Sequence, residues 1–378
     1  IRAPLRLGRC ARGQAASRAL VGEMIDRYGF ELPASKASAA PSDKEYLEQV
    51  RTENSQLFKW QKMIADWATY THGDKHKKLK QRVREGIPDG IRGHIWQSLS
   101  GALDARIAQP GRYGAMLRQP SPMDSQIRKD LHRTMPTHVQ FKQGADGQQQ
   151  LFNVCHAIAL HEPQMGYNQA EAYVVATLLT YMTEEEAFYV MASITSERGY
   201  SRMWADSMEG WDEYGRQVLD QLVRERQPRL HRHLESHGVT VDLYAMPWFL
   251  TLFTKDFPFE STLRVLDVFL GEPHPKGAKI LFRVVLAVLK HTERELLAMD
   301  DVQQLTEHIR TAPARVAQLQ GSRLMESAHA ISLKSRKLRL TVPSAPTRPP
   351  ARSAQHGRPT SPQPPAWSRG RRPRPPAR

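Results

Sequence analysis

Apolar residues recur along most of the chain at the three- and four-residue spacing of helices. Residues 277–297, "GAKILFRVVLAVLKHTERELL", begin as an almost continuous apolar run and become amphipathic toward their end. Residues 212–238 show an amphipathic pattern that Pro228 interrupts and Gly238 ends. Both stretches are therefore predicted to be helices, the second of them broken at its proline.

The same reading extends to residues 41–334. Residues 184–194 follow Thr183, and Thr183 with Glu186 has the spacing of an N-terminal capping box. Alternating strand patterns are nearly absent, and no repeat of 20–50 residues is visible. We therefore predict an all-α fold, and a helical unit of this length is expected to form two packed lobes.

The charge of the chain is concentrated at its ends. The 378 residues carry a net charge of +15, but residues 1–20 hold five arginines and no acid. Residues 335–378 hold eleven Lys or Arg, eleven prolines and no acid. The sequence between these ends is nearly neutral. Such termini cannot bury a core, so we predict a disordered leader (1–40), a folded domain (45–315) and a disordered tail (335–378).

Two interpretations of the Arg-rich leader stay open: an organelle transit peptide, or an unstructured leader in a sequence that does not begin with Met. No run of eighteen apolar residues predicts a membrane span. The two cysteines, Cys10 and Cys155, are far apart, which favours a reducing compartment. We expect a cytoplasmic protein, with peripheral binding to endomembranes as a further expectation.

Several kinds of chemistry leave no signature in the sequence. A Walker A loop, a dinucleotide fingerprint, HExxH and CxxC are all missing. Of the histidines His231, His233 and His237, only the last two share a helical face, and we interpret all three as exposed helix residues. No metal site is predicted.

The segment "MDSQIRKDLHRTMP" (123–136) places an arginine at a predicted helix end. Ile127 has helical spacing to the following apolar residue, Asp130 precedes Arg133 by three residues, and Pro136 stops the helix. One interpretation is an i,i+3 surface ion pair worth a few tenths of a kcal/mol. The other is a guanidinium held ready for a partner.

A second polar group lies at the start of a later helix. Tyr167 and Gln169 come just before a strongly apolar helical stretch, and Arg92 and Trp96 are spaced one helical turn apart upstream. An arginine that neutralises γ-phosphoryl charge and a glutamine that orients the attacking water are the two groups that activate GTP hydrolysis. Arg133 and Gln169 are candidates for these roles.

These segments resemble the signature motifs of the TBC domain, the family of Rab GTPase-activating proteins. The pattern RxxxW matches Arg92 and Trp96, IxxDxxR matches Ile127, Asp130 and Arg133, and YxQ matches Tyr167 and Gln169. Residues 26–30, 153–169, 248–258 and 263–289 look like the same family. The resemblance covers roughly residues 45–315, with the motifs in the family's order. The chain looks most like the small family members that carry little besides this domain.

The resemblance implies an arginine finger at Arg133 and a glutamine finger at Gln169, both inserted into a GTP-bound Rab. It also implies that Asp130 holds the guanidinium and that Tyr167 supports the glutamine segment. Arg92 and Trp96 would be structural. The chain would need no cofactor of its own, because the partner GTPase supplies GTP and magnesium, and it would act on another protein's turnover rather than on a substrate of its own.

This sequence departs from the family pattern directly after the glutamine. Ala170 and Glu171 stand where Gly and Met are usual. We expect the Ala170 methyl to press on a switch region and Glu171 to bring negative charge near a phosphate. These residues support the alternative of a catalytically weak TBC-fold module that binds or scaffolds a Rab.

The tail suggests two further partners. Residues 343–348 and 373–378 fit a polyproline ligand pattern for SH3 domains, which is a weak signal in so proline-rich a segment. Trp367 is the tail's single aromatic residue, so the tail offers no base-stacking platform and we do not expect nucleic-acid binding.

Overall fold

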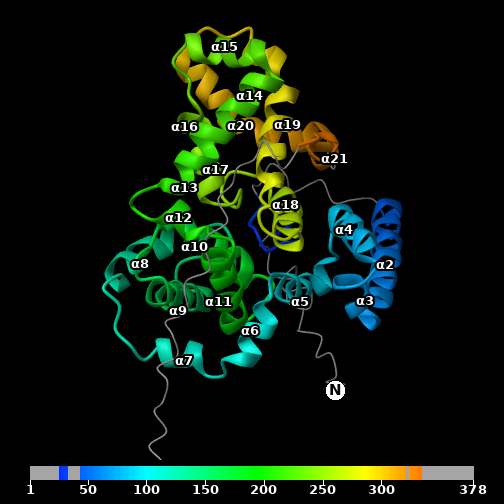
Figure 1. The fold of residues 1–378 in the computed structure, drawn as a ribbon, viewed down its shortest axis with the longest axis vertical. Helices are drawn as coiled ribbons and strands as arrows, with labels where there is room; N and C mark the ends of the chain where they lie inside the picture. The colour runs from blue at the N-terminus through cyan, green and yellow to red at the C-terminus, as the bar shows by residue number, and fades with distance from the viewer. Residues whose placement is uncertain (1–24, 33–42, 321–322, 334–378) are drawn as a thin grey trace, which may run out of the picture. The chain divides into compact units, whose positions relative to one another are not determined.

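Helices make up most of the part of the chain that this computed structural model describes, residues 25–32, 43–320 and 323–333 (Figure 1). All these residues belong to one packed unit. In chain order, the elements of the first half are α2 (Asp43–Ala65), α3 (Trp67–Thr71), α4 (His76–Glu85), α5 (Asp89–Ser100), α6 (Ala102–Ala108), α7 (Arg112–Met116), α8 (Asp124–Asp130), the 3₁₀ helix η3 (Leu131–Arg133), α9 (Asp146–His161), α10 (Gln169–Leu179), α11 (Glu184–Ala192) and the π-helix η4 (Ser193–Glu197). Those of the second half are α12 (Ser201–Trp204), α13 (Glu209–Trp211), the π-helix η5 (Asp212–Leu219), α14 (Asp220–Arg226), α15 (Pro228–Ser236), α16 (Val241–Tyr244), α17 (Met246–Leu250), α18 (Phe259–Gly271), α19 (Lys279–Leu296), α20 (Val302–Gln320) and α21 (Arg323–Ala330). The all-α prediction is confirmed.

Local sequence signals set several of these boundaries as predicted. Thr183 and Glu186 form the capping box at the start of α11, where the Thr183 amide donates to Glu186 Oε2 at 2.9 Å. Pro228 opens α15, because a proline at the first helical turn costs no hydrogen bond. Gly238 ends that helix with a φ of +69°, a conformation that glycine adopts without strain.

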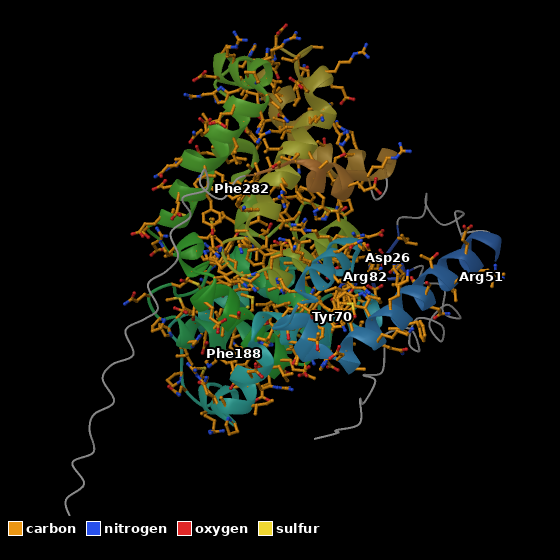
Figure 2. All side chains as sticks on the ribbon, turned by 45° about the vertical axis from the view of Figure 1, so that its right-hand side comes forward. Asp26, Arg51, Tyr70, Arg82, Phe188 and Phe282 are labelled. Carbon is orange, nitrogen blue, oxygen red and sulfur yellow. The ribbon has the colours of Figure 1, made fainter. Side chains whose placement is uncertain are left out.

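Two sets of helices can be followed within the unit (Figure 1). In the first, α9 packs against α8, α10 and α11, and α11 also packs against α5 and α6. In the second, α19 packs against α20 and α21, while α14 contacts η5 and α15. Helix α18 contacts α4, α5 and α19, so it joins the two sets. Phe188 on α11 and Phe282 on α19 mark their interiors (Figure 2), and both are almost fully buried.

The predicted helix over 212–238 begins as a π-helix. Trp211 is fully buried, and its ring lies so close to Gly215 that an added Cβ there would be 2.4 Å from it. A residue with any side chain at this position would clash with the ring. Glycine therefore lets the tryptophan pack against the backbone of η5.

Residues 25–32 differ from the disordered leader that we expected over 1–40. Asp26 Oδ1 accepts hydrogen bonds from the amides of Tyr28 and Phe30, both at 2.9 Å, which closes a turn. The Phe30 ring meets the His138 ring edge-on, with 4.8 Å between centroids. Main-chain bonds add to these contacts, from the Glu31 amide to the Thr137 carbonyl at 2.9 Å and from the Val139 amide to the Gly29 carbonyl at 3.0 Å. The rest of the leader, the 335–378 tail and its two SH3-type motifs lie outside the described residues.

Candidate functional site

Arg133 is the last residue of the short helix η3, which continues α8 by one turn. Its guanidinium pairs with Asp130, the last residue of α8. The two side chains differ in exposure, since that of Asp130 is 1% exposed and that of Arg133 is 51% exposed. The carboxylate is therefore fixed inside the protein while the guanidinium is presented to solvent.

Further donors hold the Asp130 carboxylate. Gln126 Nε2 donates to Asp130 Oδ2 at 3.1 Å from one turn earlier on α8. The Tyr167 hydroxyl also interacts with the Asp130 carboxylate. Burial raises the pKa of Tyr167, and the acidic groups around it, Asp130 among them, raise it further. The phenol therefore stays protonated and able to donate at neutral pH.

Gln169 is the first residue of α10, as the sequence predicted. The preceding Asn168 caps this helix, with its Oδ1 accepting from the Ala170 amide at 2.9 Å. The Gln169 side chain is half-buried, and its carboxamide hydrogen-bonds to no residue in the part of the chain that the structure describes. Its donor and acceptor are therefore both available to a partner.

Arg92 and Trp96 form a separate, buried network on α5. Asp267 on α18 accepts from Arg92 Nε at 3.1 Å and from Trp96 Nε1 at 2.9 Å. Arg92 also pairs with Asp89, and it approaches the Tyr181 hydroxyl at 3.3 Å. Within the described ranges, none of these bonds reaches the residues of the candidate fingers, so the structure brings together Asp130, Arg133 and Tyr167 but not Arg92 and Trp96.

Asp267 is a residue to which sequence reasoning gave no role. It is fully buried, and its second oxygen accepts from the Ile87 amide at 3.0 Å. The signal that could have found it is a single acid within the apolar run "VLDVFL", because a buried carboxylate needs partners.

The two departures after the glutamine do not lie where we expected them. Ala170 is 9% exposed and belongs to the hydrophobic core. Glu171 is fully buried, and neither of its oxygens has a hydrogen-bond partner. Burial raises the pKa of Glu171 well above its usual range, which favours the neutral carboxyl over the carboxylate. The expected negative charge beside a phosphate is wrong, because the helix turns Glu171 inward.

The histidines of α15 also differ from expectation. His231 is buried on the same face as Leu230 and Leu234, and its Nε2 lies 3.1 Å from Asp220. His233 is half-buried and contacts the Met299 carbonyl at 2.8 Å.

In the described part of the chain, no three His, Cys, Asp or Glu side chains gather where they could hold a metal ion. Among the described helices, none has the length and apolar character that a bilayer crossing requires.

Comparison with known proteins places the chain in a family. The sequence profile of RabGAP-TBC, the Rab-GTPase-TBC domain, matches residues 89–297, which is more than half of the chain. The chain belongs to this family. The match falls inside the 45–315 domain expected from the sequence, whose outer bounds stay a prediction.

Full-length relatives agree. The chain is 33% identical to mouse TBC1 domain family member 10A over 302 residues, covering 78% of this chain and 58% of that protein. It is 35% identical to mouse Carabin over 340 residues, covering 84% and 70%. It is 34% identical to the Caenorhabditis elegans Rab GTPase-activating protein tbc-11, covering 64% and 26%. The chain thus spans less than two thirds of the first and third of these proteins.

Solved structures share the fold. The Chlamydomonas flagellar RabGAP TBC domain superposes with a TM-score of 0.63 and 26% identity, covering 81% of this chain and 99% of that one. The Ypt/Rab-GAP domain of Gyp1p superposes with a TM-score of 0.58 and 19% identity, covering 71% and 97%. The second likeness shows the fold alone.

Proposed function

We propose that this protein accelerates GTP hydrolysis by a Rab-family GTPase, with Arg133 and Gln169 inserted in trans into the partner's nucleotide site. The observation that carries the proposal is the contrast between an exposed Arg133 guanidinium and the buried Asp130 that holds it. The uncommitted carboxamide of Gln169 supports the same reading. The name of the worm relative, a Rab GTPase-activating protein, is consistent with it.

The chemistry follows from where charge develops during hydrolysis. Water attacks the γ-phosphorus, the bond to the bridging oxygen breaks, and negative charge grows on the phosphoryl oxygens and on the leaving oxygen of GDP. A planar guanidinium donates two parallel hydrogen bonds to such oxygens. The carboxamide oxygen accepts a hydrogen bond from the attacking water, and the carboxamide NH₂ donates one to a second oxygen, which aligns the water.

The anchoring of Arg133 lowers the cost of this delivery. A free arginine loses about 2 kcal/mol of rotamer entropy when it is immobilised. The Asp130 carboxylate already restricts the guanidinium before a partner arrives, so less entropy is lost on binding.

GTP and magnesium would come with the partner. We propose a cytoplasmic site of action, where GTP-loaded Rab proteins are available. Peripheral membrane association stays a prediction.

The alternative of a weak Rab-binding module loses the observation that favoured it. That interpretation depended on Ala170 crowding the partner and on Glu171 carrying charge, and both side chains are buried. We therefore retain the catalytic proposal alone.

A panel of GTP-loaded Rab proteins tests it. Single-turnover hydrolysis is measured with wild type, with Gln169→Ala and with Gln221→Ala, an exposed glutamine on α14, as the matched control. We expect at least one Rab to be accelerated by wild type and by the control, but not by Gln169→Ala. A panel covering the family without any accelerated Rab would refute the proposal.

A further inference from the structure

Tyr173 connects the two candidate finger segments through the main chain. Its hydroxyl donates to the carbonyl oxygen of Arg133 at 2.9 Å, across 40 residues of sequence. Tyr173 lies on α10, one helical turn beyond Gln169. We propose that Tyr173 is a positioning residue that fixes the Arg133 finger relative to the Gln169 finger. This inference rests on the proposed function.

The Arg133 carbonyl lies where the local backbone leaves its helix. A helix end leaves carbonyl groups without partners inside the helix. Thr134 has an extended conformation with φ −93° and ψ 111°, and Met135 has a φ of +47°. The chain therefore turns sharply just after Arg133. Thr134 Oγ1 donates to the Asp130 carbonyl at 3.0 Å and the Thr134 amide to the Leu131 carbonyl at 3.2 Å, while the Tyr173 hydroxyl supplies the donor to the Arg133 carbonyl itself.

Tyr167 and Tyr173 flank Gln169 and attach to different groups of the arginine segment. Tyr167, two residues before Gln169, interacts with the Asp130 side chain. Tyr173, four residues after it, bonds to the Arg133 main chain. A single attachment would let the segment pivot about one point, whereas two attachments fix its orientation. The arginine and glutamine segments are thereby held as one unit.

The surroundings of Tyr173 keep its hydroxyl in place as a donor. The ring is half-buried, and the Lys255 ammonium lies 5.6 Å from the ring centroid. Burial raises the pKa of Tyr173; the nearby Asp256 raises it further, while Arg133 lowers it. The phenol therefore remains protonated through neutral pH.

The size of the effect follows from the geometry that catalysis requires. A displacement of about 1 Å at a reacting group can cost roughly 10²-fold in rate. Removal of the hydroxyl alone loosens the Arg133 backbone while the ring stays in place. We therefore expect Tyr173→Phe to lower the maximal rate about tenfold.

The first arm of the experiment is single-turnover hydrolysis at increasing concentrations of the activator. The matched control is Tyr189→Phe, which removes an equivalent bond from a tyrosine hydroxyl to a main-chain carbonyl, that of Gln109 at 2.7 Å. We expect Tyr173→Phe to lower the maximal rate and leave the half-saturating concentration unchanged, and the control to change neither. In an Arg133→Ala background, Tyr173→Phe should cause no further loss, because the group it positions is gone.

The second arm needs no GTPase. Amide hydrogen exchange of residues 131–137 is measured in the free full-length protein, and we expect it to be several-fold faster in Tyr173→Phe than in Tyr189→Phe. Unchanged amide exchange overturns the inference. So does a Tyr173→Phe variant that changes only the half-saturating concentration and not the maximal rate. A further loss of rate in the Arg133→Ala background would also overturn it. If wild type accelerates no Rab, the proposed function fails, while the exchange result still decides whether Tyr173 holds the segment.

Discussion

Two arginine–aspartate pairs in this protein have the same chemistry and opposite exposure. Arg92 is 6% exposed and pairs with Asp267, which is 0% exposed. Arg133 is 51% exposed and pairs with Asp130, which is 1% exposed. In both pairs the carboxylate is buried and has further donors. The guanidinium is buried in the first pair and exposed in the second.

That difference distinguishes a structural pair from the pair that we propose to be functional. With both groups buried, Arg92 and Asp267 join α5 to α18, and neither group can reach a second molecule. With only the acid buried, Arg133 is oriented by the protein and still accessible. A motif pattern alone does not reveal this difference, because it does not report the exposure of a side chain and because Asp267 lies 175 residues from Arg92.

The largest effect on stability is expected at Arg92. Removing one partner of a buried ion pair leaves an uncompensated charge, which costs about 3–5 kcal/mol. Arg92→Ala should therefore lower the free energy of unfolding by this amount in denaturant titration. A loss below about 1 kcal/mol, the range of surface pairs, would show that the buried network does not stabilise the fold.

The next effect concerns Glu171, a buried acid that lacks the donors of Asp130 and Asp267. Because burial raises its pKa, Glu171 binds a proton more tightly in the folded state than in the unfolded state. The stability that this tighter proton binding contributes is fully present below the pKa of the unfolded state, about 4.3. It is lost as pH rises from there through the higher pKa of the folded state. Glu171→Met should stabilise the protein by about 1–3 kcal/mol.

The isosteric variant Glu171→Gln isolates the proton. Its stability advantage over wild type should grow between pH 5 and pH 8, because the amide cannot ionise. Melting curves across this range provide the measurement. An advantage that is constant with pH would mean that Glu171 titrates normally in the folded protein.

Arg133→Ala is expected to cost much less stability than Arg92→Ala. A half-exposed ion pair contributes about 1 kcal/mol or less, and Asp130 keeps its contacts with Gln126 and Tyr167. Denaturant titration of the two variants side by side measures the contrast directly. Equal losses would show that Arg133 is structural after all.

The smallest effect is expected from deleting residues 335–378. Their Pro- and Arg-rich composition offers almost no apolar surface to bury. The melting temperature should change by less than about 2 °C, which corresponds to under about 1 kcal/mol for a domain of this size. A drop of several degrees would indicate that the tail packs against the helical unit.

Much of the fold was predictable because its signals are local. The helical periodicity of 277–297 matches α19, and the capping box at Thr183 and the break at Pro228 appear where they were expected. The π-helix after Trp211 was not predictable, because it depends on a ring packing against Gly215. The turn at Asp26 was missed for the same reason: its anchor, His138, is distant in sequence.

Only the site residues that belong to sequence motifs could be predicted. Arg133, Asp130, Tyr167 and Gln169 were named by pattern; the structure brings the first three together, and the roles of all four stay a prediction. Asp267 and Tyr173 were not named, because their partners are far away along the chain. The burial of Glu171 was missed because a glutamate two residues into a helix usually faces solvent.

The central claim is that Arg133 acts on a partner's nucleotide, and one comparison tests it most directly. Single-turnover hydrolysis of a responsive, GTP-loaded Rab is measured with wild type, Arg133→Ala and Arg224→Ala. Arg224 on α14 is also an exposed arginine (64%) paired with a carboxylate one turn away, Asp220 at 3.4 Å. Arg133→Ala should lose about 10³-fold or more of the acceleration, while Arg224→Ala should match wild type and both variants should still bind the GTP-loaded Rab. If a folded Arg133→Ala variant accelerates hydrolysis as strongly as wild type does, the account is contradicted.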